Sequence, residues 1–129
     1  MTNNYLDTDI ALARYNPDGS LDPTFGSSGL VTTRLNESET ARAVAIQPDG
    51  KIVVAGNISR VDRTHDFLVL RYNEDGTLDS SFGEEGVVTT DFYNTMDFAA
   101  DMAITPNGEI IVGGMVSWSV QDSDFAHKW

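Results

Sequence analysis

The sequence has 129 residues, of which 40% are hydrophobic, and this is enough to build one packed domain. A formal net charge of −12 disfavours binding to the phosphates of nucleic acids or to anionic lipid surfaces. The chain contains no cysteine, which excludes disulfide frameworks and thiolate metal sites.

The first ten residues, MTNNYLDTDI, carry neither a basic segment nor an apolar one. We therefore expect no signal peptide in this chain, and the cellular location stays open. The apolar runs that follow are far shorter than the ~20 residues needed to cross a bilayer, so no membrane insertion is expected.

Residues 8–35 predict two strands joined by a long excursion. The segment Asn16-Pro17-Asp18-Gly19 fits a type I turn in which glycine takes the positive φ angle that follows. Gly26 and Gly29 flank two residues near the second strand, where we also expect positive φ angles.

Residues 41–92 predict four antiparallel strands, which we expect at Ala41–Gln47, Lys51–Asn57, Asp66–Asn73 and Val87–Phe92. The first is short and alternates small residues with others, and the remaining three are rich in β-branched or aromatic residues; runs of this kind bounded by Gly, Pro, Asn or Asp are the pattern of strands. No segment keeps a helical apolar period for roughly ten residues. The second and third strands are apolar at successive positions, so both of their faces should be covered.

Residues 99–129 resume the same pattern, because the chain is a tandem repeat. DIALARYNPDGSLDPTFGSSGLVTT at Asp9–Thr33 returns 57 residues later as DFLVLRYNEDGTLDSSFGEEGVVTT. AIQPDGKIVVAG at Ala45–Gly56 returns 58 residues later as AITPNGEIIVGG. The last segment therefore predicts two further strands and a truncated third that begins at Asp124.

A repeated four-stranded antiparallel sheet with both faces covered predicts an all-β fold of β-propeller blades. A two-sheet sandwich is the alternative, but it normally leaves one face of each sheet polar. Residues 8–35 then supply half a blade, residues 41–92 a complete blade, and residues 99–129 another half blade, about two blades in all.

The sequence resembles the delta-60 repeat, a bacterial tandem-repeat family of largely unknown function whose arrays are regarded as β-propellers. The resemblance rests on the pattern R-Y-N-x-D-G-x-L-D-x-x-F-G at Arg14–Gly26 and Arg71–Gly83, and on the two AI-x-P-x-G segments between them. It covers about Asp9 to Asp124 and implies a secreted or surface-associated array.

Propellers close their ring with about four to eight blades, so two blades leave open faces and edges. The C-terminal half blade of one chain can meet the N-terminal half blade of the next, and three or four chains then close a ring of about six or eight blades. An open filament built on the same contact and a piece of a longer array are the alternatives.

Oxygen-bearing side chains alternate in the two repeated acidic turns, so Asp18, Asp22, Asp75 and Asp79 are weak candidates for calcium ligands. Glycine is misplaced for an EF-hand and no bidentate Glu follows, so we favour aspartates that bond to their own turns. We predict no catalytic residue, no cofactor site and no other metal site.

Arg14 and Arg71 occupy the same repeat position, within an apolar strand. We expect each to pair with a repeated aspartate of a neighbouring blade, and the candidates are Asp9 and Asp66 or Asp22 and Asp79. Trp118 and Trp129 have no repeat counterpart, and Trp118 is expected to pack under a loop.

Three functions fit these observations. The first is a non-enzymatic scaffold that offers its loops to another macromolecule, which the repeat favours because everything repeated serves turns and packing. The second is a calcium-stiffened surface or adhesion element. The third, an enzymatic or carbohydrate-binding site in the central channel, rests on fold analogy alone.

Overall fold

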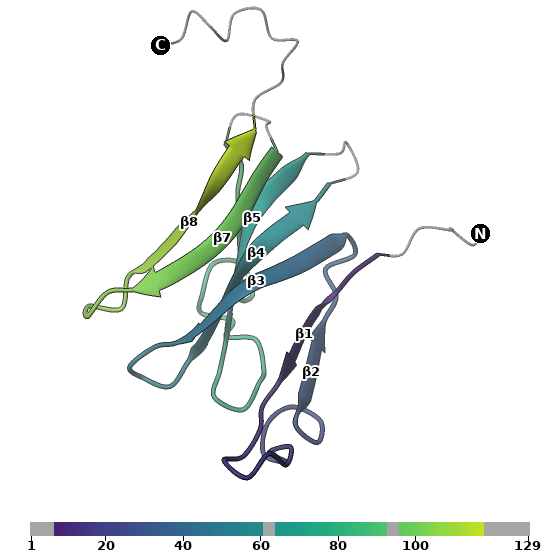
Figure 1. Ribbon diagram of the computed structural model, residues 1–129, viewed down its shortest axis with the longest axis vertical. Coiled ribbons are helices and arrows are strands. Elements are labelled where there is room, and N and C mark those ends of the chain that lie inside the picture. Colours follow the sequence, from purple (N-terminus) through teal and green to yellow (C-terminus); the bar gives the residue numbers. More distant parts are fainter. Residues whose placement is uncertain (1–6, 61–63, 93–95, 118–129) are drawn as a thin grey trace, which may run out of the picture.

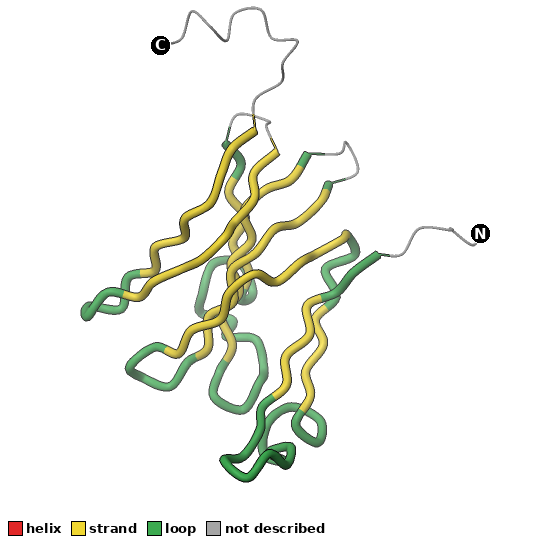
Figure 2. Tube along the Cα trace, in the orientation of Figure 1, coloured by secondary structure: helices red, strands yellow, loops and turns green. Residues whose placement is uncertain are grey.

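A computed structural model describes residues 7–60, 64–92 and 96–117, and its described part consists of strands and connecting loops (Figure 2). The strands lie in three successive layers (Figure 1). The first layer is the antiparallel pair of β1 (Ile10–Ala13) and β2 (Leu30–Thr33).

The middle layer is a complete four-stranded antiparallel sheet. Its strands pair in chain order, and they are β3 (Ser38–Ile46), β4 (Ile52–Ser59), β5 (His65–Tyr72) and β6 (Val87–Thr90). The third layer is the hairpin of β7 (Met96–Ile104) and β8 (Ile110–Ser117), which touches the middle sheet's ladder only through the bridge between His65 and Met96. The all-β prediction of four-stranded blades, about two to a chain, is confirmed.

Two strands begin earlier than the sequence indicates. β3 starts at Ser38 and β7 at Met96, each three residues before the segment expected. Each of these early segments carries an acidic residue, which looks exposed in the sequence, yet Glu39 and Asp97 are fully buried. The predicted truncated strand from Asp124 and both tryptophans lie outside the described residues.

The main hydrophobic core lies between the first layer and the middle sheet. Ile10 and Phe25 from the first layer pack against a set of β4 and β5 side chains, namely Ile52, Val54, Ile58, Leu68, Leu70 and Tyr72. The Tyr72 hydroxyl also bonds to Thr33 Oγ1 across the layers, at 2.6 Å. Face-to-face packing of this kind is what successive propeller blades require.

The opposite face of the middle sheet packs against β7. Val53 and Ala55 of β4 are fully buried there, and Asn57 Oδ1 accepts a bond from the Ala99 N–H at 3.0 Å. β4 is therefore covered on both faces, as its unbroken apolar run predicts. No helix long and apolar enough to span a membrane occurs in the part of the chain that the structure describes.

The first and third layers each keep one open face. Large apolar side chains are exposed there, with Tyr15 at 62%, Ile111 at 58% and Met115 at 64% of their full accessibility. The repeat counterparts of the first two, Tyr72 and Val53, are fully buried. The open faces thus carry side chains of the kind that the middle sheet buries.

Candidate functional site

The long connection between the third and fourth strands of each blade is held by an arginine and an aspartate. Arg14 Nε donates to Asp22 Oδ2 at 3.0 Å, and Arg71 Nε donates to Asp79 Oδ2 at 2.9 Å. Each guanidinium also lies over a phenylalanine ring of the same connection, at 4.5 Å and 4.7 Å. These ion pairs are formed within one repeat, which corrects our expectation of pairs between blades.

Of the two aspartate pairs considered as partners, Asp22 and Asp79 are the ones that bind these arginines. The other two aspartates pair elsewhere: Asp9 lies 3.7 Å from Arg34, and Asp66 accepts from Arg60 Nε at 3.0 Å. The sequence could not separate the two sets, because both recur at the repeat period.

The four calcium candidates are engaged in turn contacts. Oδ1 of each aspartate accepts two bonds, from the backbone N–H and the hydroxyl of the residue two positions on, at distances between 2.6 and 3.0 Å. The hydroxyls belong to Ser20, Thr24, Thr77 and Ser81. These hydroxyl bonds are the largest of the effects that hold the pKa of each of the four carboxyls below its usual range. The aspartates thus serve as turn acceptors.

Asp79 forms one more ion pair than its counterpart Asp22, because Lys51 Nζ also lies 3.2 Å from Asp79 Oδ2. We expect Asp79→Asn to lower the melting temperature at pH 7 more than Asp22→Asn does. A lowered pKa means that the stabilisation is complete above the ordinary carboxyl value of 3.8 and is lost as the pH falls below it. The gap between the variants should therefore shrink in acid. Thermal unfolding, followed by circular dichroism at pH 7 and at a pH below 3.8, checks this. An equal loss for the two variants at pH 7 contradicts it.

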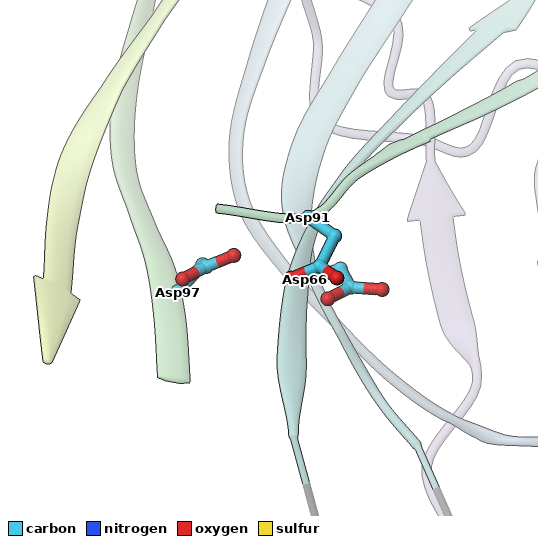
Figure 3. Close-up of side chains that lie close together, drawn as sticks. All are labelled: Asp66, Asp91 and Asp97. Atoms are coloured by element: carbon cyan, nitrogen blue, oxygen red, sulfur yellow. The ribbon is translucent and has the colours of Figure 1, made fainter. Parts of the chain in front are cut away.

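A second acidic group, not found from the sequence, lies where the middle sheet meets the third layer. Carboxylate oxygens of Asp66, Asp91 and Asp97 lie within 4.8 Å of one another, and Figure 3 shows their side chains. They come from the start of β5, the residue after β6 and the start of β7. Asp66 and Asp97 are buried and Asp91 is exposed. Carboxylate oxygens are ligands of hard cations such as Ca²⁺ or Mg²⁺, but three of them are fewer than the six to eight oxygens that Ca²⁺ takes.

The first blade junction holds the corresponding residues with a different charge. Asp9, Arg34 and Glu39 are the repeat counterparts of this acidic group, so arginine occupies the position of Asp91. Comparing the two copies position by position would have revealed the acidic group. In the second junction, Arg60 supplies the counter-charge to Asp66 instead.

Glu39 and Asp97 share a structural task. Glu39 accepts the N–H groups of Leu35 and Glu37 at 3.2 and 3.1 Å, and Asp97 Oδ2 accepts the N–H of Phe92 at 2.8 Å. Both carboxylates therefore hold the chain that passes from one blade to the next. Burial raises the pKa of Glu39, although the two N–H bonds oppose this shift.

His65, at the start of β5, lies against Phe98 with ring centroids 4.9 Å apart. The other histidine, His127, is outside the described residues. The described histidine therefore packs at the junction between the middle sheet and the third layer.

Two hollows lie at the open side of the third layer. A groove of about 640 Å³ separates β8 from the face of β5 and β6, and it is lined by Phe67, Phe82, Val88, Ile110 and Val112 among others. A wider hollow of about 1020 Å³ lies over β7 and β8 and includes Ile111 and Met115. Both are largely apolar, which favours contact with protein over contact with a charged small molecule.

The comparisons with known proteins agree with the architecture. A family model described as a domain of unknown function (DUF5122) beta-propeller matches residues 7–25 and 47–82. No curated protein matches the chain at a significant level. The blade-like layers and this similarity together show that the chain folds as β-propeller blades.

Proposed function

We propose that this chain is a non-enzymatic propeller scaffold that assembles head-to-tail with copies of itself into a closed ring. The observation that carries the proposal is the complete sheet held between two half blades with exposed apolar faces. About three or four chains would supply the six or eight blades of a closed propeller. The loops of the ring would then offer a surface to another macromolecule.

The use of the repeated polar residues supports a role without catalysis. The arginines pair with aspartates, the aspartates accept from turn hydroxyls, and Glu39 and Asp97 bind backbone N–H groups. Each of these groups already performs a structural task at two equivalent places. A catalytic set has no need to recur at every blade.

We also propose that the repeat is of the delta-60 type. Its pattern at Arg14–Gly26 and Arg71–Gly83 is supported by what the residues do: the arginine binds the aspartate, the asparagine bonds within its turn, and the phenylalanine receives the guanidinium. The pattern thus describes one self-contained connection.

The mass of the particle in solution tests the assembly. Light scattering should give three or four times the mass of the 14.1 kDa chain over a range of concentrations. A single chain at every concentration would contradict the ring, and a mass that grows without limit would indicate the open filament.

The calcium-stiffened alternative makes a different prediction. A bound ion raises the melting temperature as its concentration rises, by mass action. We expect no such rise with CaCl₂, because the turn aspartates already accept bonds from their own turns, and at the second junction Asp66 is paired with Arg60 while Asp97 accepts the N–H of Phe92. A midpoint that climbs with calcium, and does so less in Asp75→Asn, would favour the alternative. Sodium chloride of equal ionic strength is the control, because it screens the net charge of the chain to the same extent.

A further inference from the structure

Besides the apolar core, three of the polar contacts between the first layer and the middle sheet involve β5 and the turn after it. The Tyr72 hydroxyl bonds to Thr33, the Gly26 N–H donates to the Asp75 carbonyl at 2.8 Å, and Arg14 Nη1 donates to the Glu74 carbonyl at 2.7 Å. One side of every contact comes from the connection or strands of the first layer. The other side comes from β5 and the turn after it.

The same contacts have counterparts at the two open ends of the chain. Thr90, Gly83 and Arg71 correspond to the residues of the first layer, and they lie on the open side of the middle sheet. Tyr15, Asp18 and Pro17 correspond to the residues of β5 and its turn, and they lie on the open side of the first layer. Tyr15 and Thr90 are both exposed, whereas Tyr72 and Thr33 are buried. The matching halves of one more junction are thus present, but at opposite ends of the chain.

The apolar side chains follow the same rule. Phe67, Phe82 and Val88 line the groove beside β8, and their counterparts Ile10, Phe25 and Val31 belong to, or pack against, the main core. In that core, β5 covers them with Leu68, Leu70 and Tyr72. The residues at the same positions of β1 are Ala11, Ala13 and Tyr15, all of them exposed. The open face of β1 is therefore shaped to close the groove of another copy.

The open face of the third layer also has a complement in a second copy. Ile111 and Met115 are counterparts of Val53 and Asn57, which lie against β7. β3 of a second copy is the repeat counterpart of β7. Its residues at the positions that face β4 in the present copy are Val44 and Ile46, which are 60% and 63% exposed. Leu21 and Leu30 join this contact as the counterparts of Leu78 and Val87, which pack against the main core. The contact between two copies then uses seven of the eight exposed large apolar side chains of the described residues: Tyr15, Leu21, Leu30, Val44, Ile46, Ile111 and Met115.

We infer that β8 of one copy and β1 of the next form a single composite blade, paired antiparallel in the register of β4 with β5. That register pairs Val54 with Leu70 and Ile58 with Asp66. Transferred by the repeat offsets, it pairs Val112 with Ala13 and Val116 with Asp9 of the neighbouring copy. The inference rests on the proposed head-to-tail assembly and adds its partner strand and its register.

Engineered cysteines test the register without interference, because the chain has none of its own. Four single variants are made: Val112→Cys, Val116→Cys, Ala13→Cys and Asp9→Cys. They are mixed in the four possible pairs of one C-terminal and one N-terminal variant, oxidised, and run on a denaturing gel without reductant. Paired residues of antiparallel strands are about 4.5–5.5 Å apart between Cα atoms, within the range of a disulfide. A shift of four residues separates them by about 13 Å.

Disulfide-linked dimers are expected for Val112→Cys with Ala13→Cys and for Val116→Cys with Asp9→Cys, and reductant should remove them. The two crossed pairs should give at least tenfold less. Each variant serves in one matched and one crossed pair, and the far-ultraviolet dichroism of each variant is compared with that of the unmodified protein to recognise one that folds poorly. Equal yields in all four mixtures, or stronger crossed pairs, overturn the register. If the particles have ring mass and the matched pairs still fail to link, the composite blade is wrong while the assembly stands. A single-chain mass for the unmodified protein overturns both.

Discussion

Gly56→Ala should unfold the protein or lower its melting temperature by on the order of 10 °C. Gly56 lies opposite the irregularity at Ala41 and Ala43 in the pairing of β3 with β4. A Cβ atom there would collide with the backbone carbonyl of Thr40, which cannot move without breaking the ladder. Severe losses of about 3 kcal/mol or more arise from overpacking of this kind.

The chain supplies a matched control for this substitution. Gly113 lies next to Gly114, the counterpart of Gly56, and nothing lies within 4 Å of a Cβ atom at Gly113. Its own counterpart is Ala55. Gly113→Ala should therefore keep the melting temperature or raise it slightly, since alanine reduces the freedom of the unfolded chain. Thermal unfolding of both variants checks the pair, and a similar loss for the two would contradict the explanation from close approach.

Ile111→Asp should reduce the particle to single chains while leaving each chain folded. The side chain is 58% exposed in one copy, so the charge costs the isolated chain little. In the ring, this position corresponds to Val53, which is fully buried. Burying an unpaired carboxylate costs several kcal/mol, and each ~1.4 kcal/mol weakens association tenfold. We expect association to weaken at least about 100-fold.

Met96→Asp is the control for this effect. Met96 is the one exposed large apolar residue of the described chain that the closing contact does not use, at 40% exposure. It lies on β7 of the same hairpin, so both variants place a new charge on the third layer. Light scattering should give ring mass for Met96→Asp and single chains for Ile111→Asp, with unchanged far-ultraviolet dichroism. Ring mass for both variants would show that the open face of β8 takes no part in the assembly.

The repeat period predicts much of the fold because it places equivalent residues in equivalent surroundings. Strand order, the alternation of faces and the covering of β4 all follow from the apolar runs and their turns. The sequence did not predict the early starts of β3 and β7. Glu39 and Asp97 look like surface acids in the sequence, but both are buried, where they accept hydrogen bonds from backbone N–H groups of the preceding connection.

The candidate site was predictable only in part, and for a related reason. The acidic turns were found because Asp18 and Asp75 recur in a turn pattern, and their contacts are local. The group of Asp66, Asp91 and Asp97 comes from three separate parts of the chain, and its charge departs from the repeat at one position, where the first junction has Arg34. A search for repeated residues overlooks the position at which the two copies differ in charge.

Amide hydrogen exchange along β8 is the most direct test of the account. In one chain β8 pairs with β7 alone among the described residues, so the N–H groups on its other edge should exchange freely. If the composite blade forms, those N–H groups of Ile110–Ser117 should be protected as strongly as the ones of Ile52–Ser59 in β4, which is paired on both sides. Fast exchange on that edge, in particles shown to have ring mass, would contradict the claim that neighbouring copies complete each other's blades.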